Sequence, residues 1–194
     1  MIQKKNISAI ILAGGKSSRM GSEKGFLEVN GKNFMSRIIA AVKPFVSDII
    51  IVSDNAAYDI FECKRHDDLI KNSGPLAGLF TGLFYSESDT NLVLSCDVPL
   101  INEAVIQQLL MSFDAKYEAN QLQSEGKTMP LVAIYKKQCM HPFLEQLKKG
   151  ERRLRTVVEQ LRTKTITIDK ELAPLIRNIN TPSELITIKN EIEH

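Results

Sequence analysis

The chain has 194 residues, of which 43% are hydrophobic and 25% are charged. Both fractions are typical of soluble globular proteins and exclude a disordered or fibrous chain, and the length suits a single domain over residues 1–194. With 25 basic and 23 acidic residues, the net charge is only +2. That charge is too small to draw the protein to nucleic acid or to an anionic membrane, so neither is expected as a partner.

No apolar run approaches the ~20 residues of a membrane-spanning helix. No small-residue cleavage site follows the first apolar run, and a cytoplasmic location is therefore expected. The three cysteines, Cys63, Cys96 and Cys139, lie far apart and form no CxxC or Cys/His cluster. We expect neither a disulfide nor structural zinc, and interpret the cysteines as small core residues.

Hydrophobic periodicity predicts alternating strands and helices along the chain. The predicted strands cover residues 7–12, 49–52, 92–94, 131–135 and 165–168. The predicted helices cover residues 34–42, 76–84, 103–113, 143–148 and 154–161, and a final helix follows Thr181. This order predicts an α/β fold of three α/β/α layers around a Rossmann-like, mostly parallel sheet. Residues 115–128 are polar and are expected to form an exposed loop.

Three helix starts carry capping signals. Asn33 and Asn102 stand where the N-caps of the helices over residues 34–42 and 103–113 are needed. At the last helix Thr181 is the expected N-cap, Pro182 fills the first helical position, and Glu184 completes a capping box.

The loop after the first strand, LAGGKSSRMGSEK over residues 12–24, is a candidate polyphosphate cradle. Its three glycines allow backbone amides to approach an anion, and Lys16, Arg19 and Lys24 add three positive charges within nine residues. The Walker A pattern fails because Ile10 stands where a glycine is required, and GxGxxG fails at Lys16. A glycine-rich turn with solvated basic residues remains the alternative.

Asp97 lies in the loop over residues 95–99, which directly follows the strand over residues 92–94, and is a candidate ligand for Mg²⁺. In open α/β sheets, ligands bind beyond the carboxyl ends of the strands, where this carboxylate would face the glycine-rich loop. Mg²⁺ is commonly held by one or two carboxylates together with phosphate oxygens and waters. Helix capping is the alternative role, but Asn102 is better placed for it.

An acidic pair, Asp67 and Asp68, precedes a turn at Gly74 and Pro75. Either carboxylate could accept hydrogen bonds from a base or a ribose, and simple solvation of the pair remains the alternative.

Five segments together resemble the molybdenum cofactor guanylyltransferase (MobA) family: LAGGKSSRMGSEK, GPLAG at residues 74–78, CDVP at 96–99, GERRLR at 150–155 and NINTPSEL at 178–185. The first segment alone marks only the wider nucleotidyltransferase group. The resemblance implies a sheet of the nucleotidyltransferase type and a reaction in which GTP and molybdenum-loaded molybdopterin give the guanine dinucleotide cofactor and pyrophosphate, with Mg²⁺ required. Other molybdenum cofactor biosynthesis proteins are possible partners.

The resemblance also implies roles for individual residues. Backbone groups of Leu12, Ala13 and Gly14 would hold guanine and ribose, and Gly15 and Lys24 would face the triphosphate. Asn55 and Asp67 would contact the nucleoside, and Asp97 would hold the metal and the α-phosphate. Asn178 and Asn180 would line the pterin side.

Two positions depart from the family pattern. Glu23 replaces an aspartate before the lysine, and the segment GKTMP at residues 126–130 replaces Arg-x-His-Pro. The second change removes a familiar contact of the pterin site.

In the implied reaction, the terminal phosphate of molybdopterin attacks the α-phosphorus of GTP. The nucleophile is already an oxyanion, so no enzyme base is required. Catalysis would then rest on Arg19, Lys24 and the metal on Asp97. Arg152 and Arg153 open a predicted helix and could bind the acceptor's phosphate or a partner protein, with a solvated helix end as the equal alternative.

Three alternatives stay open. A molybdopterin cytidylyltransferase or a sugar-1-phosphate nucleotidyltransferase would use the same loops, because base choice depends on a few hydrogen bonds. A non-catalytic nucleotide-binding or cofactor-delivery protein would keep the fold without turnover.

Overall fold

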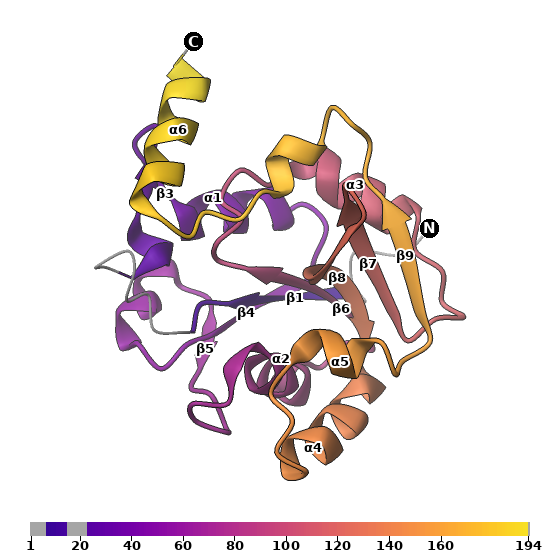
Figure 1. The fold of residues 1–194 in the computed structure, drawn as a ribbon. Coiled ribbons are helices and arrows are strands. Elements are labelled where there is room, and N and C mark those ends of the chain that lie inside the picture. Colours follow the sequence, from indigo (N-terminus) through magenta and orange to yellow (C-terminus); the bar gives the residue numbers. More distant parts are fainter. Residues whose placement is uncertain (1–6, 15–22, 194) are drawn as a thin grey trace.

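A central seven-stranded sheet organises the computed structural model, which describes residues 7–14 and 23–193 (Figure 1). The strand order across the sheet is β5-β4-β1-β6-β8-β7-β9. The bounds are β1 Ile7–Leu12, β4 Asp48–Val52, β5 Lys64–His66, β6 Thr90–Ser95, β7 Ala119–Ser124, β8 Lys127–Lys136 and β9 Thr163–Thr167. Only β8 runs antiparallel to its neighbours, β6 and β7. The predicted mostly parallel α/β fold is confirmed.

Helices cover both faces of this sheet (Figure 1). On one face lie α1 (Phe34–Val42) and α3 (Glu103–Met111); on the other lie α2 (Gly74–Tyr85), α4 (Met140–Lys148) and α5 (Leu154–Val158). Strand β1 serves both layers, because Ala9 and Ile11 pack with α1 and α3 whereas Ile10 and Leu12 pack with α2. All six residues of β1 are buried, as expected for a central parallel strand.

The last helix, α6 (Pro182–Glu193), packs outside these layers against a two-stranded hairpin formed by β2 (Glu28–Val29) and β3 (Lys32–Asn33). A small apolar cluster lies beneath it and contains Val29, Phe34, Leu100, Ile179 and Ile188. This cluster joins the C-terminal segment to the β2–β3 hairpin, to the start of α1 and to the loop that follows β6.

The three predicted N-caps are confirmed. Asn33 Oδ1 accepts from Ser36 N at 2.8 Å, and Asn102 Oδ1 accepts from Val105 N at 3.2 Å. At α6, Thr181 Oγ1 accepts from the amide of Glu184 at 3.3 Å, and Glu184 Oε2 accepts from the amide of Thr181 at 3.0 Å. These bonds satisfy amides that would otherwise have no partner in the first turn of each helix.

The prediction of an exposed loop over residues 115–128 is wrong, because β7 lies in the middle of this segment and pairs with both β8 and β9. Two of its polar residues, Asn120 and Gln121, are buried with partners of their own. Asn120 Oδ1 accepts from the amide of Asp114 at 3.0 Å, and Gln121 Nε2 donates to Thr165 Oγ1 at 3.3 Å. A strand whose polar groups are satisfied in this way shows no alternation of apolar and polar residues.

Two smaller expectations concern cysteines and membranes. All three cysteines are free; Cys96 and Cys139 are buried as predicted, and Cys63 is half-buried. None of the helices in the described part of the chain has the length and apolar character that a bilayer span requires.

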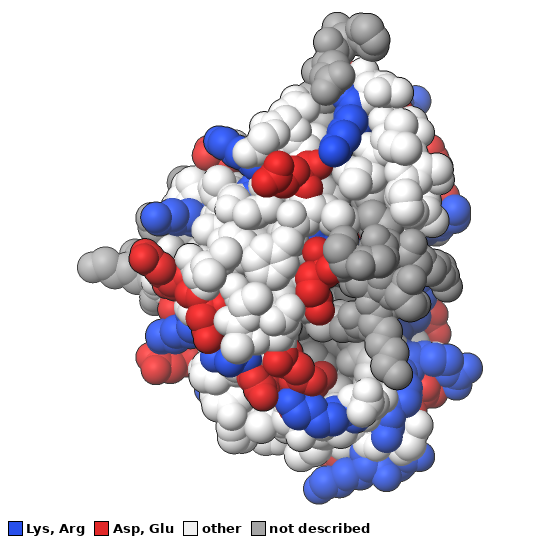
Figure 2. Space-filling model, turned by 90° about the vertical axis from the view of Figure 1, so that its left-hand side faces the viewer, with Lys and Arg blue, Asp and Glu red and all other residues white. Residues whose placement is uncertain are grey.

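The strand order creates a crevice at the carboxyl edge of the sheet. From β1 the chain moves to β4 and β5 on one side, and then crosses to β6 on the other. The end of β1 is held to the ends of both neighbouring strands, because Cys96 N after β6 donates to Leu12 O at 3.0 Å and Ala13 N donates to Val52 O of β4 at 3.0 Å. Figure 2 faces this edge, with several acidic side chains near its middle. Such a reversal of strand order is the usual place for a ligand.

Candidate active site

Lys24, Asp97 and Asn180 meet at the carboxyl edge of the sheet. Lys24 Nζ lies 3.7 Å from Asp97 Oδ2 and donates to Asn180 Oδ1 at 2.6 Å. The side chains of Lys24 and Asp97 are only 16% and 17% exposed. The ammonium group is therefore held in a fixed place between an acid and an amide, with a small opening to solvent.

Among the described residues, one oxygen of Asp97 has no hydrogen-bond partner. Asp97 Oδ1 is buried, and no hydrogen-bond donor reaches it from the described residues. A buried carboxylate oxygen without a donor is costly. A divalent cation would satisfy this oxygen. Asp97 therefore fits the role of the single protein carboxylate in a Mg²⁺ site that phosphate oxygens and water complete. Within the described ranges, no three His, Cys, Asp or Glu side chains group together as a metal cage.

Tyr58 supports the turn that carries Lys24. This turn is a short 3₁₀ helix, Lys24–Phe26, whose Gly25 amide donates to the Tyr58 hydroxyl at 3.3 Å, while the hydroxyl donates to Glu23 Oε2 at 3.3 Å. Burial raises the pKa of Tyr58, with the nearby Glu23 carboxylate adding to the effect. The rings of Phe26 and Tyr58 pack together, with 4.8 Å between their centroids. Tyr58 carried no signal in the sequence.

A cavity of about 760 Å³, here called the edge cavity, opens beside this cluster. Its walls come from the ends of β1, β4 and β6 and from the start of α2: Leu12, Ala13, Gly14, Glu23, Val52, Ser53, Asp54, Asn55, Asp68, Asn72, Ser73, Gly74, Pro75, Gly78, Ser95 and Leu131. The volume lies in the ordinary range for small-molecule sites.

Four predicted nucleotide-binding residues line the edge cavity: Leu12, Ala13, Gly14 and Asn55. The backbone amide of Ala13 is engaged by Val52 O, so it holds the loop rather than a ligand. Asn55 Oδ1 accepts from Ala57 N at 2.9 Å and caps a 3₁₀ helix, Ala56–Phe61, so this oxygen is already engaged. The predicted residues Gly15 and Arg19 lie outside the described part of the chain.

The structure brings Asp68 to the edge cavity and leaves Asp67 outside its walls. The Asp67 carboxylate instead pairs with Arg65 and, at 3.4 Å, with Lys71 on the surface. Asp68 Oδ1 accepts from Thr81 Oγ1 at 2.9 Å, and burial raises the pKa of its carboxyl. The acidic pair in the sequence indicated a site for hydrogen bonds to a base or a ribose, but the sequence did not show that Asp68 is the member of the pair that faces the cavity.

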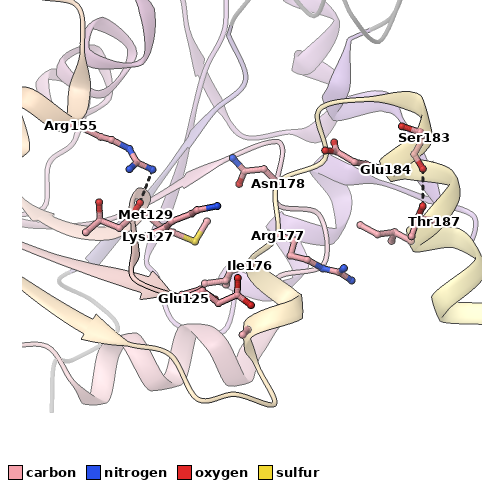
Figure 3. A pocket seen from close by; sticks show the side chains of 14 residues that line it. Glu125, Lys127, Met129, Arg155, Ile176, Arg177, Asn178, Ser183, Glu184 and Thr187 are labelled. Carbon is pink, nitrogen blue, oxygen red and sulfur yellow. Dashed lines mark hydrogen bonds between the residues drawn. The ribbon is translucent and has the colours of Figure 1, made fainter.

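A second cavity of about 580 Å³, here called the α6 cavity, lies between β8 and α6 (Figure 3). Asn178, predicted on the pterin side, lines it together with three cations, Lys127, Arg155 and Arg177. Arg155 is oriented by a 2.9 Å bond from its Nη2 to the carbonyl oxygen of Thr128. Arg155 belongs to the GERRLR segment, in which the sequence predicts acceptor contacts for Arg152 and Arg153.

Arg152 and Arg153 do not line the α6 cavity. Arg153 pairs with Glu151 at 2.8 Å, and Arg152 donates to the carbonyl oxygen of Leu147 at 2.9 Å. The Arg153 side chain and the amides of both arginines lower the pKa of Glu151 to about 2. In this geometry the two arginines close the turn before α5.

The Lys24 cluster stands between the two cavities. Glu23, next to Lys24, lines the edge cavity, and Ser95 of the same cavity is two residues before Asp97. On the other side, Asn178 and Glu184 flank Asn180 and line the α6 cavity. An arrangement of two pockets with a cation and an acid between them suits a reaction that joins two substrates.

Comparison with known proteins decides the family. The family model described as "MobA-like NTP transferase domain" matches residues 9–165. The chain belongs to this MobA-like nucleotidyltransferase family. The predicted enzyme class, a nucleotidyltransferase, is thereby confirmed.

Similar proteins agree with this assignment. A Flavobacterium johnsoniae protein named "Probable molybdenum cofactor guanylyltransferase" is 33% identical over 179 residues, which cover 92% of this chain and 94% of the relative. A protein of the same name from a Geobacillus strain is 29% identical, with 92% and 95% covered. Among solved structures, molybdopterin-guanine dinucleotide biosynthesis protein A from Archaeoglobus fulgidus has the same fold, with a TM-score of 0.81 at 23% identity and coverage of 96% and 98%.

Proposed function

We propose that this MobA-like protein transfers GMP from GTP to molybdenum-loaded molybdopterin, giving molybdopterin guanine dinucleotide and pyrophosphate. The observation that carries the proposal is the 3.7 Å approach of Lys24 to Asp97 between two cavities. The guanylyltransferase name of relatives that match over nearly their whole length supports it.

The edge cavity would hold GTP. Its described charged residues are acidic, Glu23, Asp54 and Asp68, and carboxylates accept hydrogen bonds from the N–H groups of guanine and from ribose hydroxyls. The triphosphate would lie toward Gly14 and Lys24, where the glycine-rich loop begins. Arg19 and Gly15 of that loop are proposed to contact the phosphates as well.

The α6 cavity would hold the acceptor. Lys127, Arg155 and Arg177 can bind its phosphate, and Asn178 can donate to and accept from the pterin ring. Arg155 is attached to the Thr128 carbonyl oxygen in the segment that departs from the family's Arg-x-His-Pro pattern, so it supplies positive charge where that pattern is lost. Arg152 and Arg153 remain a hypothesis for the acceptor or a partner protein, tested by reversing their charge and measuring the KM for molybdopterin.

The chemistry needs position and positive charge. An oxygen of the acceptor's phosphate forms a bond to the α-phosphorus of GTP, and the bond from that phosphorus to the β-bridging oxygen breaks, so pyrophosphate leaves with the electron pair. Lys24 would neutralise charge on the α-phosphate or the leaving group. Asp97 would hold Mg²⁺, which when bound supplies further positive charge to the phosphate oxygens.

The alternatives are less well supported. A cytidylyltransferase or a sugar-1-phosphate nucleotidyltransferase shares the fold, but the curated relatives reported above carry the guanylyl name. A non-catalytic nucleotide-binding or cofactor-delivery protein would have little use for a buried carboxylate oxygen beside a phosphate-directed lysine. Contacts with other molybdenum cofactor biosynthesis proteins and the cytoplasmic location stay predictions.

The test is an incubation with each of the four nucleoside triphosphates, Mg²⁺ and molybdopterin, followed by identification of the dinucleotide. GTP should give the guanine dinucleotide and stoichiometric pyrophosphate. A preference for CTP or UTP would replace the guanylyl assignment, and no pyrophosphate with any nucleotide would point to the non-catalytic alternative. Asp97→Asn protein is the matched control for turnover caused by a contaminating enzyme.

A further inference from the structure

The capping box of α6 reaches one residue beyond the helix cap. In an ordinary capping box the carboxylate accepts from the amide of the N-cap residue, here Thr181, and this bond is 3.0 Å long. Glu184 Oε2 also accepts from the amide of Asn180 at 2.6 Å, which is shorter. One carboxylate oxygen thus fixes two consecutive amides of the segment that enters α6.

Asn180 passes this restraint on to Lys24. Its side-chain oxygen accepts from Lys24 Nζ at 2.6 Å, across 156 residues of sequence. One residue earlier, the amide of Ile179 donates to Asp97 O at 2.8 Å, and the Ile179 side chain is buried in the cluster under α6. The backbone of this segment is therefore held at three consecutive amides, the first by the Asp97 carbonyl oxygen and the next two by the Glu184 carboxylate.

Glu184 itself faces the α6 cavity (Figure 3). Glu184 is exposed there, and one of its two carboxylate oxygens, Oε2, accepts the bonds from the amides of both Asn180 and Thr181. The Glu184 side chain thus forms part of the wall of the α6 cavity, and two hydrogen bonds through Asn180 connect it to Lys24, which lies beside the edge cavity.

We propose that Glu184 is a positioning residue that fixes the Lys24 ammonium group through Asn180 and so ties the α6 cavity to the lysine of the edge cavity. It acts as a hydrogen-bond acceptor toward the two amides and touches no reacting atom. The positional claim stands on these contacts alone, and its consequence for turnover rests on the proposed function.

The direct test measures how fast an amine-reactive ester acylates the Lys24 amine. The ester reacts with the folded protein, and mass spectrometry of peptides from the labelled protein then gives the rate at each lysine. Lys64 and Lys71 are about half exposed and serve as internal references. Glu184→Ala should raise the relative rate at Lys24 by roughly fivefold, as expected when one ordinary hydrogen bond is lost. Asn180→Ala should do the same, and the double variant should be no faster than either single variant, because both changes break one chain of contacts.

Two control variants separate positioning from charge and from general loosening. Glu184→Gln keeps an acceptor oxygen without the charge, so Lys24 should stay close to its wild-type rate. Asn102 is the N-cap of α3 and lines neither cavity. The Asn102→Ala substitution should therefore destabilise the protein without exposing Lys24. The proposal is overturned if Glu184→Ala leaves the Lys24 rate unchanged, if Glu184→Gln raises it equally, or if Asn102→Ala does.

A second readout uses turnover. Glu184→Ala should lower kcat for dinucleotide formation by roughly tenfold, since misplacing a reacting group by about 1 Å can cost up to a hundredfold. The KM for GTP should change less than kcat. If no variant and not even the wild type forms dinucleotide while the Lys24 rates behave as expected, the proposed function fails and the positioning role stands.

Discussion

The amide of Ile179 donates to the carbonyl oxygen of Asp97 at 2.8 Å, and this bond joins the last segment before α6 to the loop after β6. On either side of Ile179, Asn178 lines the α6 cavity and Asn180 binds Lys24. One short segment therefore presents Asn178 to the proposed acceptor cavity and Asn180 to the lysine proposed to act on the phosphates of GTP.

Lys24→Ala should lower turnover about a hundredfold, the usual effect of removing a preorganised donor from a developing charge. The fold should be intact, because Lys24 pairs with Asp97 and Asn180 and is not part of the apolar core clusters. Steady-state kinetics with GTP and molybdopterin measure the change. Lys64→Ala, which removes an exposed lysine paired with Asp48, is the control and should keep wild-type turnover. Equal turnover in the two variants would remove Lys24 from the mechanism.

Asp97→Asn should abolish the dependence of activity on Mg²⁺ along with most of the activity, because it replaces one carboxylate oxygen with an NH₂ group that cannot bind a cation. The check is a Mg²⁺ titration of turnover after the metal has been removed with a chelator. Asp48→Asn changes an acid outside both cavities and should leave the titration curve unchanged. A curve for Asp97→Asn that matches the wild type would show that the metal is held elsewhere.

Two glycines of α2 should respond oppositely to substitution by alanine. A Cβ on Gly82 would collide with Cγ2 of the buried Ile10 side chain and would be only 3.1 Å from its Cδ1. Overpacking of this kind costs about 1–3 kcal/mol. A Cβ on Gly78 would be at an ordinary 3.5 Å from Leu12, so Gly78→Ala should stabilise the helix by about 0.5–1 kcal/mol.

Thermal unfolding distinguishes the two glycine variants. For a protein of this size, 1 kcal/mol corresponds to a shift in Tm of about 2–4 °C. The Tm of Gly82→Ala should fall by several degrees and that of Gly78→Ala should not fall. A Gly82→Ala protein as stable as the wild type would mean that β1 and α2 move apart more easily than their packing indicates.

Glu151 should stabilise the turn before α5 in a pH-dependent way. Its folded-state pKa is lowered from 4.5 to about 2 by Arg153 and by the amides of Arg152 and Arg153. A lowered pKa means that the stabilisation is present above the unfolded-state value and is lost as the pH falls toward 2. The difference in Tm between wild type and Glu151→Gln should be largest above pH 4.5 and should shrink steadily below it. A difference that does not vary between pH 6 and pH 3 would contradict the ion pair.

Local patterns predicted most of the fold. The continuous apolar run of β1 determined a central strand because both faces of such a strand must be covered, and it is buried throughout. Asn33 and the Thr181-to-Glu184 box predicted two helix starts, since capping depends on residues within one turn. The sequence does not predict β7, because its buried polar residues break the alternation of apolar and polar positions: Asn120 bonds to Asp114 in the preceding turn, and Gln121 bonds to Thr165, which is far away in the chain.

The sequence by itself determined the family resemblance, the alternation of strands and helices, and the candidates Lys24 and Asp97, because each depends on residues close together in the chain. Only the tertiary structure decided that Asn180 binds Lys24, that Asp68 rather than Asp67 faces the edge cavity, and that Arg155 rather than Arg152 lines the α6 cavity. These choices depend on which way a side chain points once the sheet has formed. That direction is set by packing against residues far away in sequence, which no local pattern contains.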